Sequence, residues 1–261
     1  MIEITSAQVT PGLSELFDSG MLNAHRCFGV LAGNVIGRIL TDSPSGPTWG
    51  VVREAGVGLA FIGGSIKSEE LRLAIAELRK SGDVGLSHWT GEKPGYALPP
   101  NPDAEGTDIA LEFTARSDGA TSLEALLQGM PPECTLRRMD SQLIERCLWR
   151  DDPIRVSGSL ERFLEKGVGY CLMRGDEILS EAYATYYALD TCEMATVTND
   201  AHRGKGYSTL ACAATIRECE KSGFQTVWVC ESANHASAAV ARKLGYTRER
   251  GISGALYRAA R

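Results

Sequence analysis

The chain has no basic excess and no long hydrophobic run. Lys and Arg number 27 against 33 Asp and Glu in 261 residues, which gives a formal net charge of −6 at pH 7. Nucleic-acid-binding proteins usually carry a basic excess, so this balance argues against a DNA or RNA partner and leaves an acidic surface that could attract cationic amines. No apolar stretch approaches the roughly 20 residues that a membrane span requires, and the N-terminus lacks a basic region followed by an apolar one. We therefore expect a soluble, cytoplasmic protein with no nucleic-acid or membrane partner.

Signals for disulfides and metal sites are also missing. The eight cysteines include no C-x-x-C pair and follow no secretory signal, and the four histidines show no metal-ligand spacing. We therefore expect no disulfide framework and no metal site, and the cysteines should be reduced and mostly buried. With 43% hydrophobic residues, the chain is long enough for one large domain or two of ordinary size.

The most informative stretch runs from Glu193 to Gly223. A short apolar and β-branched run, Met194 to Val197, precedes a polar turn with glycines at 204 and 206, and a helix follows. Glycine removes the side chain where the backbone must come close to a ligand, and the first amides of a helix point outward with the positive end of the helix dipole behind them. This strand, turn and helix therefore predict a pyrophosphate site.

The spacing of the turn decides between the known phosphate motifs. Its sequence, GKGYST, matches neither the G-x-G-x-x-G of dinucleotide sites nor the G-x-x-x-x-G-K-[ST] of the P-loop. Arg203-x-x-Gly206-x-Ser208 resembles motif A of the GNAT superfamily of acyl-CoA-dependent N-acyltransferases, [QR]-x-x-G-x-[GA]. Ser208 departs from it at the last place but is small enough to keep the backbone accessible. Taken alone, the turn also fits an ordinary strand-to-helix connection with a solvated basic turn.

The sequence downstream favours the first interpretation. Residues 224–230 form an apolar run of strand length, typical of a strand buried on both faces. The helix that follows resembles motif B of the same superfamily, N-x-x-[AS]-x-x-x-Y-x-x-x-G-[FY], at Asn234, Ser237, Gly245 and Tyr246. Asn234 can cap this helix and Gly245 can end it in the left-handed conformation. Ala241 occupies the usual tyrosine place, so the hydroxyl that often protonates the departing thiolate is absent.

The resemblance covers about half of the chain and implies an α+β fold, with a GNAT-like mixed central sheet flanked by helices. We expect strands at 134–139, 169–173 and 178–189 and helices at 141–147 and 158–166 before the strand at Glu193. Residues 115–132 carry a small helix that ends in Gly-Met-Pro-Pro, which is typical of a boundary. We therefore predict an N-terminal α+β domain of unknown role at 1–125 and the acyl-CoA-binding catalytic domain at 126–261.

The N-terminal half contains no motif that names a function. It should form a short helix near residues 13–17, a helix from Ser68 to Lys80, and strands at 35–40, 48–53, 57–62 and 84–89. Its role is structural by default, and the alternative is a wall of the amine-binding cleft. The two-part arrangement resembles the bacterial subfamily that includes the zwittermicin A resistance acetyltransferase, which implies acetylation of a small amine.

The resemblance also implies how acetyl-CoA is held as a cosubstrate. Backbone groups of Ala195, Thr196 and Val197 would pair with the pantetheine amides and place an N–H near the thioester oxygen. Asn234 would contact the pantetheine arm, and Ser237 belongs to the same motif. The residues of the turn would hold the pyrophosphate through amides and charge: Arg203, Gly204, Lys205, Gly206, Tyr207 and Ser208.

In this superfamily the amine attacks the thioester directly in a ternary complex. The reaction therefore needs a base to take a proton from the amine and an acid to protonate the departing thiolate. Glu193 starts the central strand and is the first candidate for the base, although it could also be a strand-end carboxylate that faces water. Glu231 is the second candidate. A proton for the thiolate could come from water or from one of four side chains, each of which could instead serve packing or capping: Tyr183, Tyr186, Cys230 and His235.

These observations predict an enzyme that moves acetyl from acetyl-CoA to the primary amine of a small molecule. One alternative is a protein or peptide N-acetyltransferase, which an open groove would favour over a deep acidic pocket. The other is a non-catalytic acyl-CoA-binding module, which would explain the missing tyrosine. A homodimer is the assembly that we consider.

Overall fold

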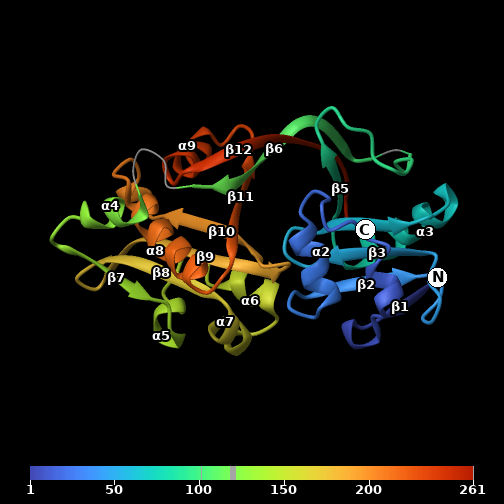
Figure 1. The fold of residues 1–261 in the computed structure, drawn as a ribbon, viewed down its shortest axis with the longest axis horizontal. Helices are drawn as coiled ribbons and strands as arrows, with labels where there is room; N and C mark the ends of the chain where they lie inside the picture. Colours follow the sequence, from blue (N-terminus) through green and yellow to red (C-terminus); the bar gives the residue numbers. More distant parts are fainter. Residues whose placement is uncertain (101, 118–121, 261) are drawn as a thin grey trace. The chain divides into compact units, whose positions relative to one another are not determined.

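The computed structural model describes residues 1–100, 102–117 and 122–260, and the chain divides into two compact units (Figure 1). Unit 1 comprises Met1–Ile109 and Gly251–Arg261, and unit 2 comprises Ala110–Arg250. Strand β6 (Ala104–Arg116) carries the chain into unit 2, and β12 (Tyr246–Tyr257) returns it to unit 1, where it pairs with β5 (Val84–Trp89). The division therefore departs from the predicted boundary between residues 125 and 126, because the crossing is made within strands and not in the loop that follows.

Unit 1 is a mixed sheet with helices packed on it. Its strand order is β1-β2-β3-β4-β5-β12, and every neighbouring pair is antiparallel except β4 and β5, which α3 connects. Leu71, Ile75 and Leu78 of α3 are buried in a cluster with sheet residues such as Val51 and Leu86. The remaining elements of the unit are β1 (Ile2–Ile4), α1 (Pro11–Ser14), α2 (Ala24–Leu31), β2 (Gly37–Thr41), β3 (Trp49–Glu54), β4 (Leu59–Gly64) and α3 (Ser68–Leu78), with 3-10 turns at Ser6–Gln8 and Arg79–Ser81.

Most elements of unit 1 follow the sequence pattern, but α2 does not. The predicted strands and the helix from Ser68 are present with ends shifted by a few residues. Residues 27–31 show only an apolar segment in the sequence, with no helix signal, and they form the greater part of α2. Seven of the eight residues of α2 are buried, including His25 and Arg26, so its polar residues do not form a solvent-exposed face, and its eight residues make only about two turns, too few for a firm assignment from the sequence.

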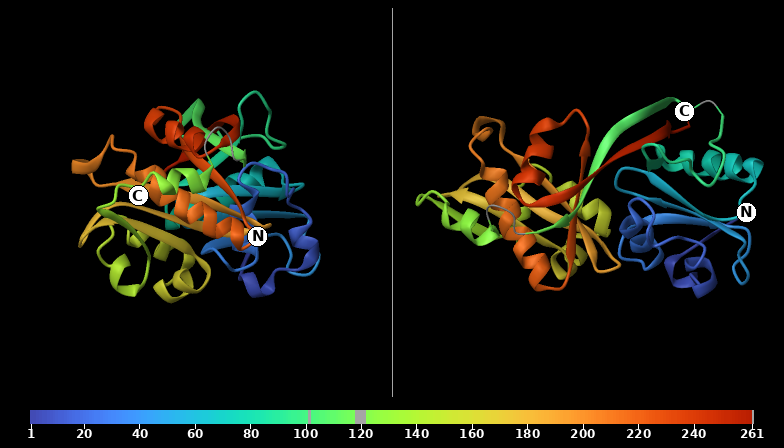
Figure 2. Two further views of the ribbon diagram at one scale, coloured as in Figure 1. Left: turned by 60° about the vertical axis from the view of Figure 1, so that its left-hand side comes forward. Right: turned by 45° about the horizontal axis from the view of Figure 1, so that its top comes forward.

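Unit 2 continues the same mixed sheet, and its helices cover both faces (Figures 1 and 2). Its strand order is β12-β6-β11-β10-β9-β8-β7, and the pair β10 and β11 is parallel because α8 connects them. One face packs against α4, α8 and α9, and the other against α5, α6 and α7. The bounds are α4 (Leu123–Gln128), β7 (Cys134–Arg138), α5 (Ser141–Ile144), α6 (Asp151–Ser157), α7 (Leu160–Lys166), β8 (Val168–Arg174), β9 (Glu177–Ala188), β10 (Thr191–Thr198), α8 (Tyr207–Lys221), β11 (Gln225–Glu231) and α9 (His235–Lys243).

The expected α+β fold with a mixed sheet flanked by helices is confirmed. Small residues such as Ala211, Ala213 and Ala214 are fully or nearly fully buried on α8, which lets this helix lie close to the sheet. The sequence did not predict α6 or β12. In β12 the charged residues Arg248 to Arg250 are exposed. They precede the apolar end of the strand, so the sequence shows no continuous strand pattern there.

The cysteines are mostly buried, as the composition predicts. All eight cysteines are free, and seven of them are buried. Within the part of the chain that the structure describes, no helix is both long and apolar enough to cross a membrane.

Gly245, directly after α9, should be the most sensitive glycine of unit 2. Its φ is +93°, and an added Cβ would lie far inside van der Waals contact of the Ser117 carbonyl oxygen. We expect Gly245→Ala to lower the free energy of unfolding by about 3 kcal/mol, because a clash with backbone adds to the left-handed conformation. Chemical denaturation followed by circular dichroism measures this loss.

Gly223 supplies the matched control. Its φ is +84°, but an added Cβ would have no neighbour within 4 Å. Gly223→Ala should therefore cost only about 1 kcal/mol, the conformational part alone. Equal losses for the two variants would contradict the clash.

Candidate functional site

The turn between β10 and α8 has the conformation that its glycines predict. Gly204 and Gly206 have φ of +77° and +78°, and Gly206 is the residue that precedes the first turn of α8. No side chain within the described residues caps this helix, so its first amides keep their hydrogen-bonding capacity for a ligand. Tyr207 points inward and is buried, so it can offer the turn its backbone N–H and not its ring.

Three cationic side chains surround this turn. Arg203 and Lys205 are exposed, and the Arg203 guanidinium forms an ion pair with Asp200 at 2.7 Å. Lys243, at the end of α9, brings its ammonium to 3.9 Å from the point where a Cβ on Gly206 would lie. Sequence analysis did not single out Lys243, and its only signal was the basic last turn of that helix. Together the amides and cations form a site that fits a pyrophosphate.

The two central strands part next to this turn. β10 and β11 pair from Thr191 to Met194 and from Gln225 to Trp228, although β10 continues to Thr198 and β11 to Glu231. Beyond this point β11 keeps its pairing with β6 on its other edge. In the described register, the backbone of 195–198 therefore has no ladder partner on the side of β11. An amide-containing chain such as pantetheine can pair there, which is the place predicted for Ala195, Thr196 and Val197.

Alternation along the strands brings the predicted catalytic residues together on one face, with one exception. Glu193 is buried, 6% exposed, and pairs with Thr185, while Ala195 pairs with the predicted acid Tyr183 two positions further along. Glu231 lies on the same face, because Glu193 is in register with Val227 and side chains alternate. Cys230 lies on the opposite face, in the core beneath α8 and α9.

The candidate acids differ in their surroundings. The Tyr183 hydroxyl donates to the Asp152 carboxylate at 2.7 Å, and burial together with this carboxylate raises the pKa of Tyr183 above its ordinary value. Burial also raises the pKa of the Cys230 thiol. Tyr186 has a φ of +57° at an irregularity of β9, and His235 is the exposed first residue of α9. Tyr183 is thus the candidate that shares the face of Glu193, and it holds its proton tightly.

Motif B serves the structure of α9. Asn234 caps the helix by accepting the Ser237 amide at 3.1 Å, as predicted, and the Ser237 hydroxyl accepts the indole N–H of Trp228 at 3.0 Å. Ala241 lies on the inward face of α9 and is fully buried. The predicted contact of Asn234 with pantetheine stays a prediction, and the Asn234 amide nitrogen is the group that could make it.

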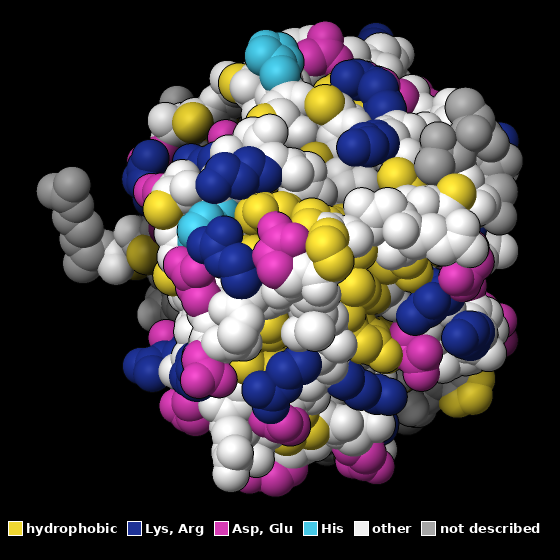
Figure 3. Space-filling model, turned by 90° about the vertical axis from the view of Figure 1, so that its left-hand side faces the viewer, with side chains coloured by type: hydrophobic (Ala, Val, Ile, Leu, Met, Phe, Trp, Pro, Cys, Tyr) yellow, Lys and Arg dark blue, Asp and Glu magenta, His cyan; other side chains and the backbone are white. Residues whose placement is uncertain are grey.

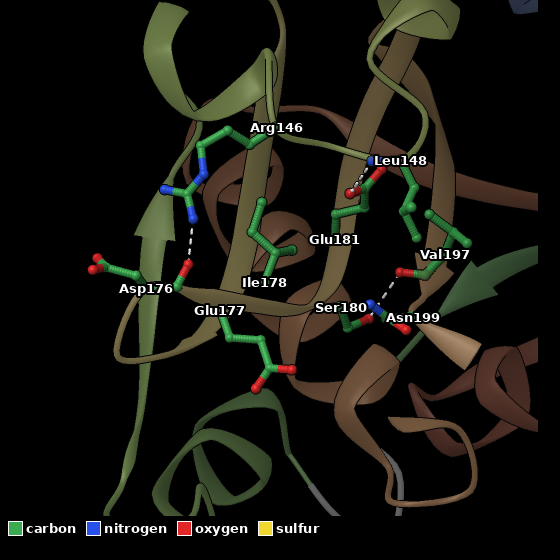
Figure 4. A pocket seen from close by; sticks show the side chains of 9 residues that line it. All are labelled: Arg146, Leu148, Asp176, Glu177, Ile178, Ser180, Glu181, Val197 and Asn199. Carbon is green, nitrogen blue, oxygen red and sulfur yellow. Dashed lines mark hydrogen bonds between the residues drawn. The ribbon is translucent and has the colours of Figure 1, made fainter. Parts of the chain in front are cut away.

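A pocket lies on the face of the sheet that carries Glu193 (Figure 4). Its volume is about 210 Å³. Glu181 is 1% exposed, sits opposite Val197 in the register of β9 and β10, and accepts the backbone N–H groups of Leu148 at 2.9 Å and Trp149 at 2.8 Å. The lining residues are Arg146, Leu148, Asp176, Glu177, Ile178, Ser180, Glu181, Val197 and Asn199.

Glu181 is the residue that sequence analysis missed. Burial raises the pKa of this carboxyl group, and the hydrogen bonds from Trp149 and Leu148 oppose the rise. Its one signal was an acidic residue in the interior of a mostly apolar and aromatic strand. With Asp176 and Glu177, it makes the pocket rich in carboxylates, which favours a cationic ligand.

Figure 3 shows the surface of the molecule on the left-hand side of Figure 1, where unit 2 lies. This surface has a hollow with hydrophobic side chains in its floor and charged side chains of both signs on its rim.

Among residues 1–100, 102–117 and 122–260, no group of three His, Cys, Asp or Glu side chains is placed to hold a metal ion.

Comparison with known proteins gives one family. A model described as GNAT acetyltransferase matches residues 103–253, which is more than half of the chain. An uncharacterized N-acetyltransferase of Bacillus subtilis (strain 168), YdfB, is 26% identical over 119 residues, which are 45% of this chain and 46% of that protein. The chain therefore spans about half the length of the curated relative that it matches.

Solved structures show the same fold over nearly the whole chain. A GCN5-related N-acetyltransferase-like protein from Streptococcus suis 89/1591 has a TM-score of 0.62 at 20% identity and covers 91% of this chain and 94% of its own. A tandem GNAT protein from the clavulanic acid biosynthesis pathway has a TM-score of 0.60 at 11% identity and covers 100% and 98%. The N-terminal half, which carries no motif, thus takes part in a tandem GNAT-like arrangement.

The turn can be tested through Gly206. An aspartate there would have to adopt a φ of +78° and would place its own carboxylate at the N-terminus of α8. We expect Gly206→Asp to abolish CoA binding in calorimetry while the circular dichroism spectrum stays native, because the carboxylate repels the phosphates. Gly223→Asp, at the far end of α8, should bind CoA normally. Unchanged CoA affinity in Gly206→Asp would contradict the site.

Proposed function

The chain belongs to the GNAT acetyltransferase family, and from this premise we propose that it transfers the acetyl group of acetyl-CoA to the primary amine of a small molecule. The amine attacks the thioester directly, with both substrates bound. The observation that carries the proposal is the separation of β10 from β11 after Met194 and Trp228, beside the glycine turn. A strand edge with free backbone groups and an anion site at its end together suit a chain of amides joined to a pyrophosphate.

The protein contributes mainly position and electrostatics to this reaction. Pairing of the cosubstrate's amides with Ala195 to Val197 fixes the thioester against β10, and an N–H of that strand can donate to the carbonyl oxygen as negative charge grows on it. Holding the amine in line with the thioester replaces a collision in solution by a reaction within one complex. Transfer forms the C–N bond of the amide and breaks the C–S bond of the thioester. Of the two protons that an ammonium nitrogen loses, one ends on the CoA sulfur and the other must be removed.

The pocket of Figure 4 supports a small, cationic acceptor. It borders Val197, one of the residues proposed to hold the cosubstrate, and Glu181 lies across from that residue on the neighbouring strand. An ammonium group must lose a proton before it can attack, and a buried carboxylate with a raised pKa is suited to receive one. A volume of about 210 Å³ admits a small molecule or one side chain of a peptide. A cytoplasmic location and a homodimer stay predictions.

A second function, acyl-CoA binding without catalysis, is favoured by one observation. Ala241 takes the place of the tyrosine that often protonates the thiolate, and it is fully buried. A thiol with a pKa near 8.5 leaves as thiolate with modest help, however, so the absence of this hydroxyl does not prevent transfer.

Thiol release separates the two functions. We expect acetyl-CoA to release free thiol in the presence of at least one small amine from a panel of polyamines, aminosugars, amino acids and peptide N-termini. A preference for peptides would favour the protein N-acetyltransferase. Confirmed CoA binding without release from any member of the panel would contradict the enzyme and leave the binding module.

The base can be tested by neutralising Glu193. If its carboxylate takes the proton from the amine, Glu193→Gln should lower kcat/KM about 100-fold or more and flatten the acid limb of the pH profile, since a neutral amide accepts no proton. Glu249→Gln, which breaks an exposed pair with Arg242, is the control and should leave both unchanged. A loss below about threefold would shift the role to Glu231, Glu181 or water.

A further inference from the structure

The segment that contains the glycine turn has a single buried side chain. Of residues 200–206, all of which the structure describes, His202 alone is buried, and the others are exposed. Gly204 and Gly206 contribute no side chain, and a Cβ on Gly204 would meet nothing within 4 Å. Arg203 is 67% exposed and its pair with Asp200 lies within the turn itself. The side chains of this segment therefore fix it to the rest of unit 2 through His202.

His202 contacts Glu177, the first residue of β9. The distance from His202 Nε2 to Glu177 Oε1 is 2.7 Å, and Arg174 donates to the other carboxylate oxygen at 2.8 Å. These hydrogen bonds, first that of His202 and then that of Arg174, hold the pKa of Glu177 below its ordinary value. An ionised carboxylate only accepts hydrogen bonds, so Nε2 is the donor.

The second ring nitrogen of His202, Nδ1, is buried and has no hydrogen-bond partner within the described residues. The ring lies 6.3 Å from the ring of Tyr207, measured between centroids, so it occupies the space between the start of β9 and the start of α8. The bond through Nε2 is therefore a side-chain hydrogen bond that ties the turn to the start of β9.

We propose that His202 and Glu177 form a positioning pair that holds the glycine turn in the conformation that binds the pyrophosphate of acetyl-CoA. Glu177 also lines the pocket of Figure 4, so the same carboxylate adjoins the region proposed for the acceptor. The pair acts on the cosubstrate through the backbone of Arg203 to Gly206, which follows His202 directly. The inference rests on the cosubstrate assigned in the proposed function and is independent of the acceptor.

Substitution of His202 by glutamine or by asparagine distinguishes the effect of the hydrogen bond from the effect of the ring's volume. The side-chain nitrogen of glutamine reaches about as far as Nε2, whereas that of asparagine reaches only as far as Nδ1. His202→Gln should keep a donor for Glu177, and His202→Asn should lose it. A role in packing alone would not make the longer amide the rescuing one.

The experiment measures CoA affinity by calorimetry in the full chain, without an acceptor. We expect CoA to bind His202→Asn and Glu177→Ala about tenfold more weakly, as loss of a charge-assisted hydrogen bond predicts, and His202→Gln to stay within about twofold of the unaltered protein. The double variant His202→Asn with Glu177→Ala should bind no more weakly than His202→Asn alone. Glu249→Gln controls for loss of an exposed ion pair.

Kinetics give a second readout once an acceptor is found. The KM for acetyl-CoA should rise in His202→Asn while kcat at saturating acetyl-CoA changes less than about twofold, because the pair shapes binding and not the reacting atoms. If His202→Asn does not fold, the CoA affinity of Glu177→Ala, measured without an acceptor, decides, since Glu177 is 47% exposed.

Three results would overturn the proposal: equal affinities for the glutamine and asparagine variants, unchanged affinity in Glu177→Ala, or additive losses in the double variant. A failure of the proposed function looks different. In that case CoA binds, the variants follow the expected order of affinity, and no amine yields free thiol.

Discussion

The unpaired edge of β10 is the constraint on which the site depends. A buried strand normally pairs on both sides, because an unsatisfied backbone group costs free energy. After Met194 and Trp228 the parallel pair opens, while β9 keeps β10 in place on its other edge and β6 does the same for β11. The gap is thus built into the pairing of the sheet and does not need a movement to open it. A ligand with amides of its own is the chemistry that completes such an edge.

The glycine turn extends this edge into an anion site at the cost of its own rigidity. Gly204 and Gly206 permit left-handed backbone and close approach, but they provide no side chain to pack. Rigidity therefore comes from both ends: α8 begins with the buried Tyr207, and the preceding 3-10 turn, Asp200–His202, inserts His202 beside Glu177. Pre-organisation of a flexible turn lowers the ordering cost of binding, which explains why a buried imidazole stands directly before an otherwise exposed segment.

The sequence predicted the parts of this site that are local and missed those that are assembled from distant segments. Gly204, Gly206 and Asn234 were found because a turn and a cap depend on neighbours in the chain. Lys243 and Glu181 were missed, since the first reaches the turn from α9 and the second gains its environment from backbone N–H groups at 148 and 149. The same limit applies to the fold. Helix α2 is only eight residues long and almost entirely buried, and the end of β12 depends on pairing with β5, far away in the sequence.

The alternation of side chains on β10 gives the two substrates opposite sides of one strand. The N-terminus of α8, with its cations, belongs to the face that the core beneath α8 defines, whereas Glu193, Glu231 and the Glu181 of the pocket lie on the face toward α5, α6 and α7. In the proposed reaction, the anionic cosubstrate and the proposed cationic acceptor are thereby drawn to different faces and meet at the edge of the strand between them. The face of Glu193 then holds a carboxylate that would accept the proton which this reaction must remove.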